Sequence, residues 1–416
     1  MKKQKLGIGI IGGGFNARFH IRAWTGVRDA DILGIFDPDQ KRAAEAAALA
    51  RKLQVGEAKT YSSITDMASN PKIDALWISA PNFTRIEVME EIVRALETGK
   101  GELIGVCCEK PLGRNVKEAK RMLELARKAK LLDGYLENQV FAPAVVRGRA
   151  IVWARGATLT GRPYLARAAE EHSGPHMPWF WEGSLQGGGV LNDMMCHSVE
   201  VARFMLTPPG ASRDVLTPVS VTAYTNCLKW QEPRYAEILK KNSGGKTDYL
   251  SRPAEDFARS LLEYKNAEGK IIVVETTTSW CYVGAGLRLS MELLGPEYSL
   301  QINTLDSGLK VFFSRQVKGK AGEDLVEKQN AEIGLMPVVA DEATEYGYIA
   351  ENRHMIRSCL KGVRPEENFS DGLNVAELLM TAYMSADQGK TVPFPPPGLA
   401  NYVPPVAKGT WNPKKR

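Results

Sequence analysis

Residues 6–20 read LGIGIIGGGFNARFH, and this stretch decides the fold. The apolar run 6–11 predicts a buried strand, after which the apolar spacing becomes helical. Between strand and helix, residues 12–17 follow the pattern GxGxxA, which suits a dinucleotide-binding turn. Gly12 permits the tight turn, and Gly14 lets the backbone approach a pyrophosphate. The order of strand, glycine turn and helix therefore predicts a dinucleotide site at a helix N-terminus.

An acidic residue follows where such a turn needs one. The apolar run 32–36 predicts a second strand, and Asp37 ends it, 23 residues beyond Gly14. An aspartate there can accept hydrogen bonds from an adenosine ribose and would repel a 2′-phosphate. The sequence thus predicts NAD rather than NADP, although Lys41 and Arg42 lie near enough to weaken the preference. The alternative is a glycine turn and a strand-end aspartate that bind no ligand.

The composition is that of an ordinary globular protein. Of the 416 residues, 44% are hydrophobic and 25% are charged, and this length favours two domains. The net charge of +6 is too evenly spread to indicate nucleic-acid binding. The six cysteines include no CxxC pair, and no apolar run reaches the roughly 18 residues of a membrane span. We therefore expect a cytoplasmic protein with reduced thiols, no membrane contact and no bound metal.

Strands and helices alternate as far as about residue 140. Apolar runs predict further strands at 73–80, 103–108 and 134–138, and helical spacing predicts helices at 39–53, 85–96 and 115–130. This order predicts a doubly wound parallel sheet of the Rossmann kind, which binds ligands at the carboxyl ends of its strands. Three of these ends carry polar or turn residues, namely Pro81-Asn82, Glu109-Lys110-Pro111 and Glu137-Asn138-Gln139.

The pattern changes beyond residue 143. A helix at 190–206 precedes a series of long strand-like runs, which predict a C-terminal α+β domain with a large, mostly antiparallel sheet. The polar stretches 229–252 and 315–345 are interpreted as insertions or surface excursions, and the proline-rich tail from about 390 is expected to lie extended. The predicted domains are residues 1–142, which bind the nucleotide, and residues 143–416, which bind the substrate and form oligomer contacts.

The order of the motifs resembles the glucose-fructose oxidoreductase / inositol dehydrogenase (Gfo/Idh/MocA) family over almost the whole chain. The motifs are GGGFNA at 12–17, Asp37-Pro38, Ala80-Pro81-Asn82, Glu109-Lys110-Pro111, Gly187-Gly188-Gly189 leading to Asp193-x-x-x-His197, and a closing helix near 370–389. The resemblance implies hydride transfer between a nicotinamide and a hydroxyl-bearing carbon of a sugar, polyol or glycoside. It also implies that Lys110, Asp193 and His197 are the catalytic residues.

The residue types support these roles. Oxidising an alcohol needs a hydride acceptor and a group that takes the hydroxyl proton. His197 titrates in the right range, and Asp193 lies four residues earlier on the same helix face. Lys110 supplies a cation for the reacting oxygen and could itself be the base. The alternative for Lys110 is a solvated lysine at a strand end, and the alternative for Asp193 and His197 is a pair on the helix surface. The expected cofactor contacts are Gly12, Gly14, Phe15, Asn16, Asp37, Pro81, Asn82, Glu109, Lys110 and Asn138.

Histidines and aromatic residues gather just before and within the predicted helix at 190–206. His172, His176 and His197 fall within 26 residues, with the run WFW at 179–181 between them. Flat aromatic rings can cover a sugar ring while histidines bind its hydroxyls. The expected substrate contacts are therefore His172, His176, Trp181 and Asp193. The alternatives are a packed aromatic cluster with incidental histidines, and a metal site that adds Cys196 or Glu137.

Departures from the family pattern leave the substrate open. Arg85 stands where the family often has a histidine, and Met195 where glycine is common. Arg85 could favour an anionic substrate, but an exposed arginine on a helix is the more ordinary interpretation. Two other classes also stay open, namely a redox-neutral enzyme that cleaves or eliminates glycosides with retained NAD, and a dinucleotide-binding sensor without turnover. Strands such as 271–274 need cover on both faces, so a homodimer or homotetramer through the second domain's sheet is expected.

Overall fold

The computed structural model describes residues 4–284, 286–313 and 334–413. The chain forms two compact units. Unit 1 consists of Met1–Pro143 and Ala343–Ala376, and unit 2 of Ala144–Glu342 and Glu377–Arg416. The structure thus differs from the predicted division in one respect, because residues 343–376 return to the nucleotide unit. The predicted excursion 315–345 lies partly outside the described residues.

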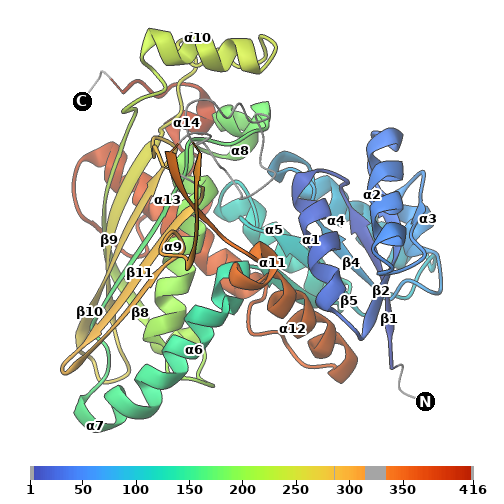
Figure 1. Ribbon diagram of the computed structural model, residues 1–416, viewed down its shortest axis with the longest axis horizontal. Helices are drawn as coiled ribbons and strands as arrows, with labels where there is room; N and C mark the ends of the chain where they lie inside the picture. Colours follow the sequence, from blue (N-terminus) through green and yellow to red (C-terminus); the bar gives the residue numbers. More distant parts are fainter. Residues whose placement is uncertain (1–3, 285, 314–333, 414–416) are drawn as a thin grey trace. The chain divides into compact units, whose positions relative to one another are not determined.

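Unit 1 is built on a parallel sheet that, within the described residues, has the strand order β3-β2-β1-β4-β5-β6 (Figure 1). Its strands are β1 (Leu6–Ile11), β2 (Ala30–Phe36), β3 (Lys59–Thr60), β4 (Ala75–Ile78), β5 (Gly105–Glu109) and β6 (Leu132–Leu136). Every neighbouring pair in this order is parallel. The order reverses between β1 and β4, and such a switch point is where open α/β sheets bind ligands.

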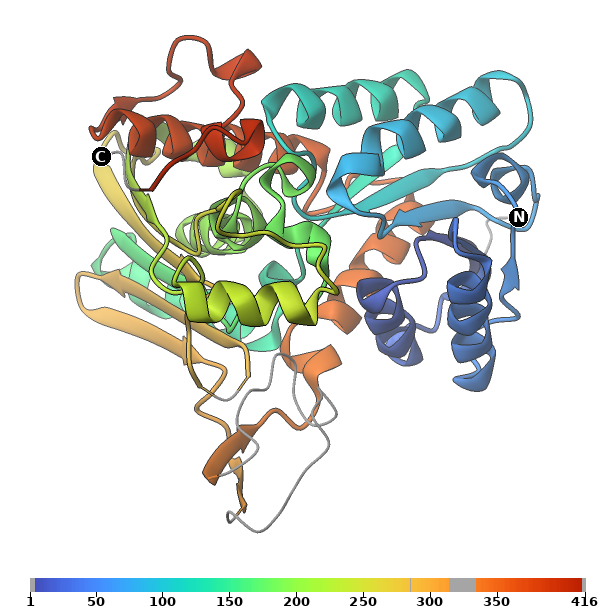
Figure 2. The same ribbon diagram turned by 90° about the horizontal axis from the view of Figure 1, so that it is seen from above.

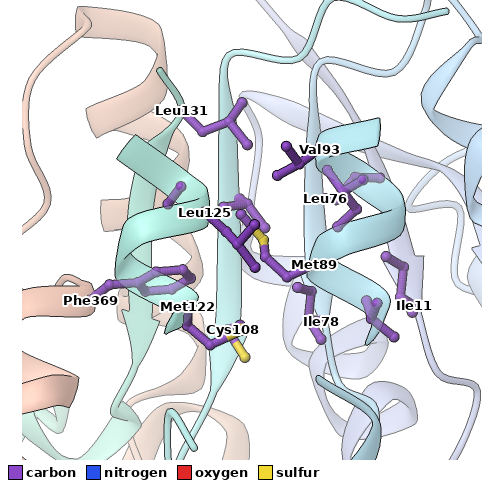
Figure 3. Packing of buried hydrophobic residues seen from close by; sticks show 14 of the residues in the cluster. Ile11, Leu76, Ile78, Met89, Val93, Cys108, Met122, Leu125, Leu131 and Phe369 are labelled. Carbon is purple, nitrogen blue, oxygen red and sulfur yellow. The ribbon is translucent and has the colours of Figure 1, made fainter. Parts of the chain in front are cut away.

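Helices pack on both faces of this sheet, with α1 and α2 on one face and α4 and α5 on the other (Figure 2). The helices are α1 (Phe15–Ala23), α2 (Gln40–Lys52), α3 (Ile64–Ala68), α4 (Arg85–Glu97), α5 (Val116–Lys128), α12 (Tyr348–Lys361) and the start of α13 (Phe369–Gln388). Asn115 caps α5 by accepting a hydrogen bond from the Glu118 backbone N–H at 3.0 Å. Figure 3 shows the apolar core, in which Met89 of α4 and Leu125 of α5 pack near Leu76 of β4.

Polar contacts attach the returning helix α12 to unit 1. The indole Nε1 of Trp77 donates to Asn352 Oδ1 at 3.0 Å, and His20 Nδ1 lies 3.1 Å from Asn352 Nδ2. All three side chains are buried. Buried polar groups need partners, so these bonds hold α12 in the nucleotide unit.

Unit 2 is built on a sheet with the order β12-β11-β7-β10-β9-β8-β15 among its described strands. The strands are β7 (Leu165–Glu171), β8 (Thr217–Asn226), β9 (Phe257–Lys265), β10 (Ile271–Ser279), β11 (Arg288–Gly295), β12 (Tyr298–Asn303) and β15 (Val392–Pro393). Strands β7 and β10 pair in parallel, whereas the other pairs are antiparallel. Strands β13 (Leu309–Phe313) and β14 (Gly334–Val338) form a separate two-stranded antiparallel sheet (Figure 2).

Helix α9 (Val190–Leu206) packs on one face of the large sheet against β7 and β10 (Figure 1). All 17 of its residues are buried. Further helices are α6 (Pro143–Ile151), α7 (Thr158–Thr160), α8 (Gly183–Gln186), α10 (Pro233–Asn242), α11 (Glu342–Glu345, at the border of the units) and α14 (Pro405–Lys408), with a π-helix at Val152–Ala157. The tail from about residue 390 is extended only in part, because it contains strand β15 but also a 3-10 helix at Leu399–Asn401 and helix α14. Among the described residues, no helix has the length and apolar character that crossing a bilayer requires.

Candidate functional site

The glycine turn of unit 1 is open where a dinucleotide would lie. Gly12 has φ of 102°, and a Cβ there would lie 2.9 Å from the Ser79 carbonyl oxygen. A Cβ at Gly14 would meet no described atom within 4 Å. No side chain of the described residues caps α1, which begins at the exposed Phe15. The N-terminus of α1 thus has no side-chain cap and carries the positive end of the helix dipole, so the residues of this turn fit the pyrophosphate of NAD.

Asp37 joins the end of β2 to this turn. Its buried carboxylate accepts hydrogen bonds from the Gly13 backbone N–H at 2.8 Å and from the Asp39 backbone N–H at 2.9 Å. The Arg42 Nε lies 3.5 Å from Asp37 Oδ1. The carboxylate therefore sits beside the glycine turn, with a cation close enough to reduce its negative potential. Asn16 lies in the first turn of α1, and its Oδ1 has no hydrogen-bond partner among the described residues.

Arg85 is neither an exposed helix residue nor a group offered to an anionic substrate, so both interpretations of it are wrong. The side chain is only 4% exposed. Its guanidinium donates to the carbonyl oxygens of Ala80 at 3.0 Å, Glu109 at 2.6 Å, Lys110 at 3.2 Å and also Pro111. Because these carbonyls follow strands β4 and β5, Arg85 holds the two strand ends, and the backbone of Lys110, in one arrangement.

Glu109 places a negative charge next to the backbone of Lys110. Its Oε2 accepts from the Lys110 N–H at 3.1 Å, and its Oε1 lies 2.7 Å from His20 Nε2. Burial raises the pKa of Glu109, but the hydrogen bond with His20 and the charges of Arg85 and Lys110 outweigh burial and lower it. Because the lowered pKa keeps the Glu109 carboxylate ionised, and an ionised carboxylate can only accept, His20 Nε2 is the donor in this pair. Glu109 is thus an ionised carboxylate, fixed by a neighbour that the sequence did not reveal.

The remaining predicted cofactor contacts lie at the same strand ends. Pro81 and the buried Asn82 follow β4. Asn138 follows β6, and its Nδ2 donates to the Tyr346 carbonyl oxygen at 2.7 Å. The structure therefore brings Asp37, the glycine turn and the three polar strand ends to one edge of the parallel sheet, where the sequence placed them.

In unit 2, α9 carries Asp193 and His197 as buried side chains, each 4% exposed. The interpretation as a helix surface pair is therefore wrong. The indole Nε1 of Trp280 donates to Asp193 Oδ2 at 3.3 Å. Glu170 Oε2 on β7 lies 3.9 Å from His197 Nε2, which is an ion-pair distance but too long for a direct hydrogen bond. The helix thus holds a carboxylate and an imidazole, each beside a defined partner.

The three other predicted substrate contacts differ from one another. His172 is buried, and its Nδ1 accepts from the Gly174 N–H at 2.9 Å, whereas His176 is exposed. Trp181 is 3% exposed, and its Nε1 donates to the Pro175 carbonyl oxygen at 3.0 Å. It also lines a pocket of about 210 Å³. The structure thus uses Trp181 largely for packing.

The partners of Trp181 show that segment 229–252 is more than a surface excursion. The ring centroids of Trp230 and Tyr249 lie 5.0 and 5.5 Å from that of Trp181, and Trp280 lies 4.9 Å away. The Trp230 Nε1 also donates to the Trp280 carbonyl oxygen at 2.7 Å. The segment therefore supplies two aromatic residues to the cluster that supports Trp280, the hydrogen-bond partner of Asp193.

Family models match both units. The "oxidoreductase family, NAD-binding Rossmann fold" matches residues 6–133, and the "GFO/IDH/MocA C-terminal domain" matches residues 157–301. The chain belongs to the Gfo/Idh/MocA family. Unit 1 is therefore the NAD-binding domain of an oxidoreductase, and the predictions of family, Rossmann domain and NAD are confirmed.

Relatives of this Gfo/Idh/MocA chain are similar over nearly its whole length. Levoglucosan dehydrogenase of Pseudarthrobacter phenanthrenivorans is 25% identical over 90% of this chain and 94% of its own. D-apiose dehydrogenase of Paraburkholderia graminis is 24% identical, with 92% and 88% covered. The crystal structure of GenD2 from gentamicin A biosynthesis in complex with NAD has a TM-score of 0.73 at 23% identity, covering 95% of this chain and 97% of that one. This likeness confirms the predicted fold class.

Three residues of this family member escaped sequence reasoning, namely His20, Glu170 and Trp280. Of the three, only Glu170 could have been noticed in the sequence. The alternation along β7 puts it on the buried face after two alanines, and a buried carboxylate is costly unless it has a partner. Trp280 directly follows strand β10, and its partner Asp193 lies 87 residues earlier. His20 meets Glu109 only in the folded unit, because the two residues are 89 positions apart in the sequence.

Proposed function

We propose that this chain is an NAD-dependent dehydrogenase that transfers hydride between the nicotinamide and a hydroxyl-bearing carbon of a sugar or polyol. The observation that carries the proposal is the pair of buried ionisable side chains, Asp193 and His197, on one helix of a family whose other domain binds NAD. The names of two relatives, levoglucosan dehydrogenase and D-apiose dehydrogenase, support the substrate class, because both names give a small carbohydrate as the substrate. The free state of all six described cysteines supports a reducing compartment, so we extend the proposal to the cytoplasm.

Each residue is given one role in this proposal. NAD, when bound, supplies the hydride acceptor. His197 takes the hydroxyl proton of the substrate, and Asp193, held by the Trp280 indole, orients a substrate hydroxyl. Lys110 donates to the reacting oxygen and stabilises the charge that develops on it. Lys110 could instead be the base, and the variants discussed below distinguish the two assignments.

A panel of sugars, polyols and glycosides tests the activity. NADH formation by absorbance and product formation by mass spectrometry are measured on the same samples. NADH in proportion to oxidised product supports the dehydrogenase. Product without net NADH would instead reveal a redox-neutral enzyme with retained NAD, and binding of NAD without any product would reveal a sensor.

The cofactor preference should favour NAD over NADP by at least about tenfold in kcat/KM, or about 1.4 kcal/mol. The reason is that the Asp37 carboxylate beside the glycine turn repels a 2′-phosphate. Asp37→Asn keeps an acceptor for the Gly13 N–H but removes the charge, so it should narrow the preference. Asp39→Asn, at the exposed N-cap of α2, is the matched control. Equal turnover of NAD and NADP by the wild type would contradict the prediction.

The large sheet should join copies of the chain into a homodimer or homotetramer. One face of the sheet is covered by α9, while the other presents half-exposed residues in register across the strands, including Leu261 of β9. On this face Arg167 forms ion pairs with Glu275 at 3.1 Å and with Glu292 at 3.0 Å. Leu261→Glu should therefore weaken assembly. Light scattering at micromolar concentration checks this, and the mass of a single chain for the wild type would contradict it.

A further inference from the structure

The N-terminus of α9 is capped by a carboxyl group from elsewhere in the chain. Glu255 is completely buried, and its Oε1 accepts from the backbone N–H groups of Gly189 at 2.8 Å and Leu191 at 3.2 Å. The Tyr383 hydroxyl of α13 donates to the same oxygen at 2.5 Å. Glu255 thus does what an N-cap side chain usually does, which Gly189 at the cap position cannot do.

This contact explains the glycine run before α9. A Cβ at Gly189 would lie 2.4 Å from the Glu255 carbonyl oxygen, and a Cβ at Gly188 would lie 2.0 Å from the Tyr383 hydroxyl. Real Cβ atoms do not approach other atoms so closely, so only glycine fits at either position. Two of the three glycines before Asp193 and His197, Gly188 and Gly189, are therefore required by Tyr383 and Glu255, whereas Gly187 has a positive φ of 92°.

The cap is connected directly to the turn that carries Asp193. The Asp193 N–H donates to the Gly189 carbonyl oxygen at 3.1 Å, and the Val190 N–H donates to the Glu255 carbonyl oxygen at 3.0 Å. Glu255 therefore accepts from three consecutive backbone N–H groups. Its side chain binds those of Gly189 and Leu191, and its backbone carbonyl binds that of Val190. A change in its hydrogen bonds would move the first turn of α9, and with it the Asp193 side chain.

The surroundings of Glu255 place its ionisation near neutral pH. Burial raises its pKa to about 7, although the hydrogen bonds from Tyr383, Gly189 and Leu191 lower it. The titratable groups that act on it are Tyr383 of α13, Cys227 and Tyr249 of the 227–254 segment, and Tyr402 of the tail, and burial raises the pKa of all four. These four are therefore neutral near pH 7. Two further carboxyl groups belong to these surroundings, namely Asp256, which follows Glu255 in the sequence, and Asp387, which accepts from the Tyr402 hydroxyl.

We propose that Glu255 is a positioning residue for Asp193 and His197, and that its charge sets the affinity of unit 2 for substrate. The proposal rests on the proposed function. An ionised carboxylate binds the helix N–H groups more strongly than a neutral one and interacts favourably with the helix dipole. As pH rises through about 7, the cap tightens. The KM for the sugar should then fall by about two- to fivefold, the range expected for one charge at a helix N-terminus.

Stability should change in the opposite direction. The pKa of Glu255 is higher in the folded protein than its ordinary value of 4.5, so the folded state binds this proton more tightly. The resulting stabilisation is fully present below about pH 4.5 and is lost as pH rises through about 7. Tighter substrate binding at high pH would thus coincide with a less stable unit 2, which a merely structural cap would not produce.

The test compares the pH dependence of KM and kcat in the wild type, Glu255→Gln and Glu263→Gln. The glutamine amide in Glu255→Gln keeps an accepting oxygen but cannot ionise, so the step in KM near pH 7 should disappear. Glu263 is a matched control, because it lies on the adjacent strand β9 and binds Ser220 Oγ at 2.7 Å. The step should persist in this control, with the effect on KM and not on kcat. A step that survives in Glu255→Gln would overturn the proposal.

A second variant covers the case in which Glu255→Gln does not fold. Tyr383→Phe removes the hydroxyl that lowers the pKa of Glu255, so the KM step should move to higher pH. An unmoved step would count against the proposal. If the wild type turns over no sugar, the proposed function fails, but hydrogen exchange of residues 190–197 at pH 6 and 8 still tests the cap. Exchange corrected for intrinsic rates should differ between pH 6 and pH 8 in the wild type but not in Glu255→Gln, and equal protection of the wild type at both pH values would overturn the role of Glu255.

Discussion

His197→Ala should lower the rate of hydride transfer by about 10²- to 10⁴-fold, the usual effect of removing a positioned acid–base group. The side chain is buried on α9 beside Glu170, and in the proposed mechanism it takes the hydroxyl proton. NAD binding should barely change, because His197 belongs to unit 2. Single-turnover hydride transfer at saturating NAD and substrate measures the chemical step, and a fluorescence titration of NADH checks binding.

Lys110→Ala completes this test. It should also lower turnover, and it should weaken NAD binding as well, because Lys110 lies at the end of β5 in the nucleotide unit. Lys117→Ala, an exposed lysine on α5, is the matched control and should have no effect. If Lys110 rather than His197 is the base, Lys110→Ala should lose the pH dependence of kcat, whereas His197→Ala should retain it. Near-normal transfer rates in both variants would disprove the proposed site.

Arg85→Ala should lower the free energy of unfolding of unit 1 by about 3–5 kcal/mol. The guanidinium donates to four carbonyl oxygens at the ends of β4 and β5, and each buried polar group left without a partner costs about 1–3 kcal/mol, part of which water recovers. NAD should also bind more weakly, because the backbone carbonyl of Lys110 loses the hydrogen bond that Arg85 donates to it. Urea unfolding and NADH titration measure the two effects.

Arg94→Ala provides the comparison for this variant. Arg94 lies on the same helix α4 but is exposed, so its loss should change stability by less than about 0.5 kcal/mol. Equal losses in Arg85→Ala and Arg94→Ala would show that the carbonyl contacts of Arg85 contribute little.

The fold was largely predictable because its signals are local. The helix at 190–206 and the strand at 6–11 have the predicted bounds, since apolar periodicity over a few residues determines both. Asp37 was found because the glycine turn and the following strand predict its position. In each case the evidence lies within about thirty residues of the feature.

The contacts that refine the site were not predictable, because their partners meet only after the sheets form. Arg85 looked like a surface residue, since its acceptors at 109–111 become neighbours only when β4 pairs with β5. Glu255 gave no signal of its own, although the glycines that it requires were visible. The sequence therefore showed that small residues are needed before α9, but it did not show that Glu255 is the residue that packs against them.

The return of residues 343–376 to unit 1 has a consequence for how the protein is made. His20 and Trp77 are separated from Asn352 by 332 and 275 residues. Their polar groups leave the ribosome long before the side chain that they bind. The chain between them contains nearly all the strands of the large sheet. On the ribosome, unit 1 therefore stays incomplete until most of the chain has been translated.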